Sequence, residues 1–234
     1  MAHYRVWISF CALSIVGVTA CNSAEPFAPE PGYKSLFNGT DLTGWRYGKE
    51  PMNGRTETPN KRFMVIDGAI VAAEGKGISD LTTIADFNGN FELKLEFRAA
   101  PKADSGVYVR GPQLQVRDFI RRNEQPGLKS VFKNDDWNEL HITVGSAANL
   151  TIMRPIGKSD SLELMVKNGK ASAKLNGQEL SEKEISMSAG VTAICRLNGV
   201  QFDPNYKPGA KGGIGLQAET GKFEFRRIRV KEMQ

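Results

Sequence analysis

Short segments in which apolar and polar residues alternate follow one another along most of this chain, and they constrain its fold more than any other feature. The segment FELKLEFR (91–98) places four apolar residues on one side and four charged residues on the other. Alternation with a period of two is typical of a β-strand with one buried face. Helical periodicity is almost absent after residue 30. The pattern therefore predicts an all-β protein.

Turn-forming dipeptides separate these segments. Asp67–Gly68 divides two apolar runs in FMVIDGAIVA (63–72), which is a strong signal for a hairpin. Asn168–Gly169 and Asn176–Gly177 divide the segment 162–180 into a meander. About a dozen short strands spaced in this way predict a single antiparallel two-sheet sandwich or jelly roll.

Two features interrupt the regular strands. The apolar parity changes across Arg226–Arg227, as it would at a β-bulge. Segments 145–160 and 186–212 show no clear strand pattern, so we expect two long loops there.

The first residues form a unit of their own. An apolar stretch, Val6–Val18, follows Arg5 and is too short to cross a membrane as a helix. Such a stretch is typical of a secretory signal. The residues Val18-Thr19-Ala20-Cys21 resemble a bacterial lipobox, which predicts cleavage before Cys21 and a lipid on that cysteine. Ordinary cleavage after Ala20 or Ala24, without a lipid, is the alternative.

The chain is thus expected to consist of a signal peptide (1–20), a tether rich in Pro, Ala and Glu (21–32) and one jelly-roll domain (33–232). We expect the protein in the cell envelope, lipid-anchored and facing the periplasm or the exterior. Without the lipid it would be periplasmic or secreted.

Charge and cysteine content exclude several other classes. The net charge is +5, but the basic residues are scattered, which argues against nucleic-acid binding. Of the three cysteines, Cys11 lies in the signal and Cys21 is the predicted anchor, so Cys195 is expected to be a buried, inert thiol. The sequence shows no serine triad, P-loop, dinucleotide fingerprint or zinc pattern, and we predict no cofactor and no metal.

The segment DSGVYVRGPQLQVRD (104–118) has an unusual polar face. It carries Tyr108, Arg110, Gln113 and Gln115 where a solvated strand usually carries Lys, Glu, Thr or Ser. An amide both donates and accepts hydrogen bonds and so suits sugar hydroxyls. This face is therefore a candidate carbohydrate site, and a polar ladder on a wet sheet is the simpler alternative.

Six segments together resemble the landmarks of the 3-keto-disaccharide hydrolase family, a group of bacterial domains. They are, in chain order, YKSLFNGTDLTGW (33–45), FELKLEFRAAPKADSGVYVRG (91–111), LQVRD (114–118), WNELHITV (137–144), KLNGQEL (174–180) and GGIGLQAETGKFEFRRIRVKE (212–232). The resemblance covers 33–232 and implies a two-sheet jelly roll like that of the concanavalin-type lectins and glucanases. It also implies an enzyme that cleaves 3-keto-glycosides. The segment 145–160 looks like an insertion in this pattern.

The resemblance carries over to particular residues of 104–118. The family's Asn-Ser-Gly…Arg pattern falls on Asp104, Ser105, Gly106 and Arg110, with Asp in place of the usual Asn. Its Glu-x-Gln…Asp pattern falls on Gln113, Gln115 and Asp118, with Gln in place of the usual Glu.

A 3-keto sugar can be cleaved with one base, because the ketone acidifies the hydrogen on C2. Loss of that proton gives an enolate, the C1 oxygen leaves by elimination, and water then adds. We expect Asp118 or His141 as the base, Arg110 as the partner of the enolate oxygen, and Tyr108, Gln113 and Gln115 as contacts to the ring. A conventional glycosidase needs two flanking carboxyls, and 104–118 offers acids only at its opposite ends.

Other candidates have simpler explanations that stay open. His141 lies on the polar face of WNELHITVG (137–145), where a histidine is usually just solvated, and Asp118 can equally be a turn residue. Arg98 and Ser105 are added as substrate contacts, although Arg98 would also fit an ion pair with a nearby acid.

The tryptophans and one acidic loop are weaker signals. Trp45 and Trp137 suit sugar stacking, but they fit core anchors at a sandwich edge better. Asn134-Asp135-Asp136 matches calcium ligands and equally any acidic loop.

The predicted function is hydrolysis of oxidised, 3-keto carbohydrates, which an upstream sugar 3-dehydrogenase would supply. The alternatives are a non-catalytic, lectin-like surface lipoprotein and a structural surface protein, because a fold does not fix a function.

Overall fold

The computed structural model describes residues 27–233 except for 168–169 and 182. The predicted signal peptide, Cys21 and the turn at Asn168–Gly169 lie outside the described residues. No helix in the described part of the chain is long and apolar enough to span a membrane. Its one helical element is a single 3₁₀ turn, η1 (Pro126–Leu128).

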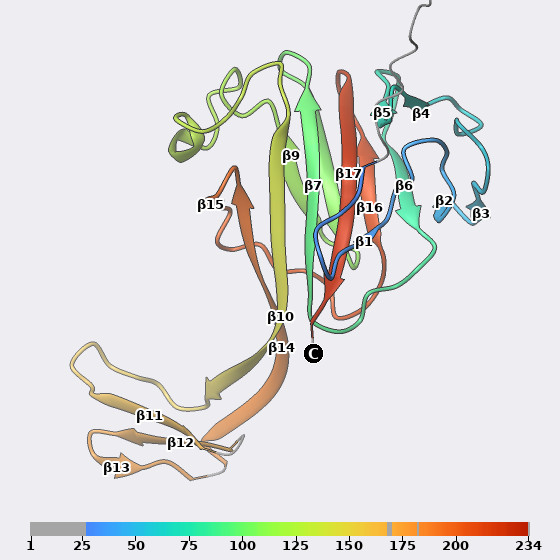
Figure 1. Cartoon of the computed structure of the whole chain (residues 1–234). Coiled ribbons are helices and arrows are strands. Elements are labelled where there is room, and N and C mark those ends of the chain that lie inside the picture. The colour runs from blue at the N-terminus through green and yellow to red at the C-terminus, as the bar shows by residue number, and fades with distance from the viewer. Residues whose placement is uncertain (1–26, 168–169, 182, 234) are drawn as a thin grey trace, which may run out of the picture.

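Two antiparallel sheets make up the body of the molecule, as the sequence predicts (Figure 1). Sheet A contains, in spatial order, β15 (Val200–Phe202), β14 (Ile185–Leu197), β10 (Asn138–Ile152), β7 (Phe91–Ala99), β17 (Phe223–Glu232), β5 (Ala69–Ala72) and β4 (Phe63–Ile66), and β1 (Lys34–Ser35) pairs with β17. Sheet B contains β3 (Glu50–Pro51), β2 (Trp45–Tyr47), β6 (Ser79–Thr83), β16 (Ile214–Ala218), β8 (Asp104–Val109) and β9 (Gln113–Arg117).

The main hydrophobic core lies between sheets A and B. Strand β7 shows the predicted alternation, with every second residue buried. Phe97 stacks on Phe223 of β17 with ring centroids 5.3 Å apart. Trp45 is fully buried and its indole N–H donates to the Leu36 carbonyl over 2.7 Å, which confirms its role as a core anchor. Cys195 is buried and unpaired, as expected.

The predicted turn and bulge are both confirmed. Asp67 and Gly68 join β4 to β5 and both have positive φ angles, 49° and 74°, as a tight hairpin turn requires. In β17 the register with β7 shifts between Arg226 and Arg229, and Arg227 has a φ of 51°. This bulge keeps Ile228 and Val230 in the core after the change of parity.

The two expected long loops are largely wrong. β10 runs for 15 residues to Ile152 and pairs with the 13-residue β14, so the two strands extend beyond the sandwich as a ribbon. At its far end lies sheet C, the predicted meander of β11 (Leu162–Lys167), β12 (Lys170–Leu175) and β13 (Gln178–Glu179) (Figure 1). Ile152 and Ile185, at the end of the ribbon, pack on a small separate cluster of buried residues in and beside sheet C. The main core, which imposes the clear alternation on β7, does not include these residues.

Candidate functional site

Three polar side chains of 104–118, those of Tyr108, Gln113 and Gln115, lie on the outer face of sheet B, away from the core. Tyr108 on β8 is directly opposite Gln113 on β9 and Gly215 on β16. On the other side of β16, Gln217 is directly opposite Asp80 on β6. Residues from four neighbouring strands therefore share this face, which we call the B face.

Two glycines let side chains lie flat on the B face. A Cβ atom at Gly106 would lie 2.0 Å from the Gln113 amide nitrogen, and one at Gly215 would lie 3.0 Å from the Tyr108 ring. Both distances are too short for ordinary packing. The absence of these two side chains therefore sets the positions of Gln113 and Tyr108.

Three side chains of the B face form a hydrogen-bonded row. The Gln113 amide donates to Gln217 Oε1 over 2.7 Å, and Gln217 Nε2 donates to the Tyr108 hydroxyl over 2.7 Å. Gln217 is only 2% exposed. The row is thus built into the sheet, and Asp80 lies on the same face, directly opposite Gln217.

A cavity of about 710 Å³ opens over this end of the B face. Its wall includes Asp80, Tyr108, Arg46 on β2 and Lys211 in the loop before β16. Neither Arg46 nor Lys211 has an ion-pair partner in the described part of the chain. The cavity thus offers two carboxylates, those of Asp80 and Asp86, a phenol and two cations without an ion-pair partner to a polyhydroxylated ligand.

The pKa values of Asp80 and Tyr108 are shifted in the same direction. Desolvation raises the pKa of Asp80, and a hydrogen-bonding interaction with the Tyr108 hydroxyl partly opposes this. Desolvation and the nearby Asp80 raise the pKa of Tyr108 to about 12. A carboxylate with a raised pKa that remains accessible from a cavity is a suitable general base.

Gln115, a predicted ligand contact, lies on the B face, but its side chain hydrogen-bonds to other residues of the protein. Its amide donates to Asp104 and to the Ser105 carbonyl. Asp104 also accepts from Arg117 Nε over 2.8 Å and lies 3.2 Å from Arg122 Nη2. The carboxylate at 104 is therefore neutralised by two guanidinium groups, and this end of the B face is structurally saturated.

Arg110 reaches the cavity wall, but its guanidinium group is mostly engaged by the protein. Arg110 has a φ of 57°, and its side chain is only 6% exposed. It donates to the carbonyls of Phe87 and Gly89, and to that of Ala210 over 3.4 Å. Arg110 therefore holds the loop after β6 in place, and its guanidinium group has little freedom to contact an enolate.

Asp118 and Ser105 do not reach the cavity. Asp118 is 0% exposed, and its Oδ2 accepts from the Lys102 amide and from Arg121 Nε, each over 2.6 Å. Ser105 is fully buried and donates to the backbone carbonyl of Gln217 over 2.7 Å. These contacts close the end of β9 and join β8 to β16, so neither side chain is placed to touch a substrate.

His141 and Arg98 lie on sheet A, so the expectation that they act together with the polar residues of 104–118 was wrong. His141 on β10 faces outward from sheet A, with its Nε2 3.2 Å from Glu92. Burial lowers the pKa of His141, although Glu92 opposes this. Arg98 pairs with Glu224 on the same outer face, which fits the simpler ion-pair explanation.

The second tryptophan and the acidic loop are also engaged within the protein. The Arg226 guanidinium lies 3.9 Å from the centroid of the Trp137 ring, and that of Arg98 lies 4.8 Å away. Trp137 is thus a partner of arginines on sheet A rather than a free platform. Asp135 pairs with Arg121 at 2.9 Å.

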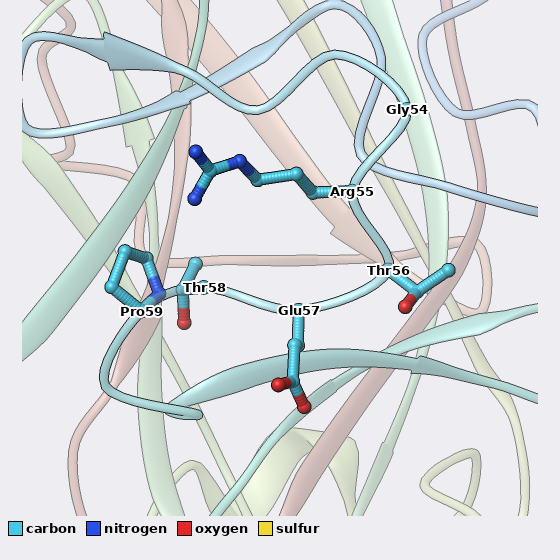
Figure 2. A pocket seen from close by; sticks show the side chains of 6 residues that line it. All are labelled: Gly54, Arg55, Thr56, Glu57, Thr58 and Pro59. Atoms are coloured by element: carbon cyan, nitrogen blue, oxygen red, sulfur yellow. The ribbon is translucent and has the colours of Figure 1, made fainter.

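Another hollow, of about 310 Å³, lies along the loop 54–59. Figure 2 shows that the Arg55, Thr56 and Glu57 side chains leave this loop in three different directions. Arg55 is paired with Glu50 at 2.9 Å. Because no set of functional groups converges there, the cavity on the B face is the better candidate site.

Comparison with known families identifies the family of this chain. A sequence profile for a 3-keto-α-glucoside-1,2-lyase-like domain matches residues 32–231. The chain belongs to this family. The resemblance of the six sequence segments to the 3-keto-disaccharide hydrolases is thereby confirmed. Membership in this lyase-like family supports a glycoside-hydrolase-like function on 3-keto-disaccharides.

Solved structures similar to this family member are distant. Two crystal structures of candidate glycosyl hydrolases from Parabacteroides distasonis ATCC 8503 share 19% and 18% identity, each with a TM-score of 0.47. They cover 87% and 86% of this chain and 94% and 99% of their own. The carbohydrate-binding module CBM66 from Bacillus subtilis shares 11% identity with a TM-score of 0.34, over 82% of this chain and 97% of the module.

Sequence identities and TM-scores this low carry no information about the position of the site. None of the curated proteins compared with this chain matches it.

Sequence reasoning missed Asp80 and Gln217, which complete the row on the B face. Gln217 lies in the terminal segment that resembles the family, and its alternation with Leu216 and Ala218 gives its outward direction. Asp80 had no comparable signal, because nothing local shows that β6 pairs with β16.

Proposed function

We propose that this protein cleaves the glycosidic bond of 3-keto-disaccharides in the cavity on the B face. The observation that supports this most strongly is Asp80, a carboxylate of raised pKa beside Tyr108 in a cavity of about 710 Å³. The amide groups of Gln113 and Gln217 extend the polar surface next to it. Family membership supplies the substrate class.

The proposed reaction begins with removal of the proton on C2. Asp80 takes this proton, and the electrons of the C2–H bond form an enolate whose charge lies on the C3 oxygen. Arg46 and Lys211, the cations of the cavity wall, are placed to stabilise that charge. The enolate then re-forms the ketone, a C1–C2 double bond forms, and the C1–O bond breaks as the leaving oxygen takes up a proton.

Hydration completes the reaction. Water adds its hydroxyl group to C1 and a proton returns to C2, so the net change is hydrolysis without any redox step. This route assigns the base to Asp80, because Asp118 is buried and His141 lies on sheet A. One base suffices, and Asp80 is the carboxylate that lies directly opposite Gln217 of the row.

Solvent deuterium distinguishes this route from direct hydrolysis. In D₂O we expect the released 3-keto sugar to carry deuterium at C2, measured by NMR and mass spectrometry before spontaneous exchange is significant. The distinction matters because Asp86 also lines the cavity, and two carboxyls are the requirement of a conventional glycosidase. The unoxidised parent disaccharide is the control and should not be cleaved. Cleavage of the keto sugar without deuterium at C2 would rule out elimination, and binding without cleavage would favour a lectin-like protein.

We also propose that the domain is carried in the cell envelope by a lipid on Cys21. The support is the sequence Val18-Thr19-Ala20-Cys21 after an apolar stretch. Mass spectrometry of the mature N-terminus is expected to find diacylglycerol on Cys21, and Cys21→Ser should release the protein from membranes or stall its processing. An unmodified N-terminus at Asn22 or beyond would contradict the anchor.

A further inference from the structure

A line of directly opposite residues crosses sheet B from β2 to β8. Arg46 is opposite Thr82 on β6, Thr82 is opposite Gly215 on β16, and Gly215 is opposite Tyr108. Directly opposite residues of antiparallel strands point to the same side of the sheet. Arg46 and Tyr108 therefore both belong to the B face, three strand spacings or about 14 Å apart.

The side chains along this line leave a floor between its two ends. The Tyr108 ring lies over Gly215, where a Cβ atom would come 3.0 Å from it. Next to it, Thr82 has a short side chain that points outward and lines the cavity. The cavity thus extends from Tyr108 over Thr82 to Arg46.

This floor gives a bound disaccharide a direction. A 3-keto unit that loses its C2 proton to Asp80 lies at Asp80 and Tyr108. Toward β9 the surface is filled by the side chains of Gln113 and Gln217, which do not line the cavity. Toward β2 the cavity stays open, so the second sugar extends over β6 to Arg46.

The charges of the cavity wall leave a place for one anion besides the enolate. The wall carries three cations, Arg46, Arg110 and Lys211, and two carboxylates, Asp80 and Asp86. None of the five forms an ion pair with another described residue. Once Asp80 holds the C2 proton, three positive charges face one carboxylate. The enolate supplies a second negative charge, and one more would balance the wall.

Arg46 is the cation suited to a further carboxylate. Its Nε and Nη1 donate to the carbonyls of Thr83 and Gly48 over long distances, 3.4 and 3.3 Å, and its Nη2 has no acceptor in the described part of the chain. A guanidinium group binds a carboxylate through two parallel N–H groups, whereas a lysine acts as a point charge. Lys211 is therefore the cation for the enolate, and Arg46 remains for the second sugar.

We propose that the substrate is an acidic 3-keto-disaccharide whose second sugar is a uronic acid, and that Arg46 binds the carboxylate of this sugar. The inference rests on the proposed function of the same cavity. It adds the class of the second sugar and names the residue that selects it.

The test compares two 3-keto-disaccharides that differ only at C6 of the second sugar, a hydroxymethyl group in one and a carboxylate in the other. In the wild type, kcat/KM should be about 10- to 100-fold higher for the acid, the range of a hydrogen bond to a charged group. In Arg46→Met the ratio of the two values should fall to about one, and Arg46→Lys should keep part of it. Equal values in the wild type would overturn the proposal.

Lys211→Met is the matched control, because it removes the other unpaired cation of the wall. It should lower the turnover of both substrates and leave their ratio unchanged. Loss of the ratio in Lys211→Met, with the ratio kept in Arg46→Met, would show that Arg46 is not the contact. A sulfate ester at C6 preferred over the carboxylate would also contradict the uronic acid.

Binding separates this inference from the proposed function. Calorimetry with Asp80→Asn, which lacks the base, should find the acidic disaccharide bound more tightly than the neutral one. Added salt should reduce this difference, since the contact is between charges. If the wild type cleaves neither sugar but keeps this preference, the proposed function fails and the acidic ligand stands. If it cleaves both equally well, the proposed function stands and the acidic substrate is refuted.

Discussion

Asp80→Asn is expected to lower the turnover of a 3-keto-disaccharide by about 10²- to 10⁴-fold, the usual contribution of a general base. Asparagine keeps the shape and an oxygen acceptor for Tyr108 but cannot take the C2 proton. Binding of the keto sugar, measured by calorimetry, should change little. The comparison of turnover with affinity therefore separates loss of the base from loss of the site.

Asp86→Asn is the matched control, since Asp86 lines the same cavity. We expect this variant to retain most of the turnover. Wild-type turnover should fall as the pH falls through the raised pKa of Asp80, because the base works only when deprotonated. An Asp80→Asn variant with near-normal turnover would remove Asp80 from the mechanism, and equal losses at both positions would favour a two-carboxyl glycosidase.

Arg110→Ala is expected to destabilise the fold by about 2–5 kcal/mol. The guanidinium group is buried and donates to the carbonyls of Phe87, Gly89 and Ala210. In the variant these three carbonyl groups would lose their hydrogen-bond donor. Leaving a buried acceptor unsatisfied costs about 1–3 kcal/mol. The free energy of unfolding in urea, measured by fluorescence and circular dichroism, tests this.

Arg98→Ala is the control variant for this measurement of the free energy of unfolding. The Arg98 side chain is 40% exposed and pairs with Glu224 at the surface of sheet A, where an ion pair contributes at most about 1 kcal/mol. If Arg110→Ala left stability unchanged and abolished binding, Arg110 would be a ligand contact, as the sequence pattern suggested. Loss of stability together with loss of activity agrees with its position in the structure.

Local chemistry was sufficient to predict much of the fold. The hairpin at Asp67–Gly68 and the bulge at Arg226–Arg227 are consequences of backbone preference and side-chain parity within a few residues. The ribbon of β10 and β14 escaped prediction because its far end packs on a small separate cluster and not in the main core, whose packing imposes the clear alternation of strands such as β7.

The candidate site, like the fold, was predictable from the sequence only in part. Period-two alternation places Tyr108, Gln113 and Gln115 on one face, and the short Gly111–Pro112 turn makes β8 and β9 neighbours, so the sequence by itself determined this part of the B face. The positive φ of Arg110 redirects its side chain into the loop after β6, which alternation could not foresee.

Only the tertiary structure decided which distant strands complete the site. His141 and Asp80 both lie outward on their strands, yet β10 joins sheet A and β6 joins sheet B beside β16. The order of strands depends on how their apolar faces pack together across the whole core, and that packing leaves no mark on the outward residues. The sequence thus determined the polar character of the face, and the packing of the two sheets determined that Asp80, and not His141, contacts it.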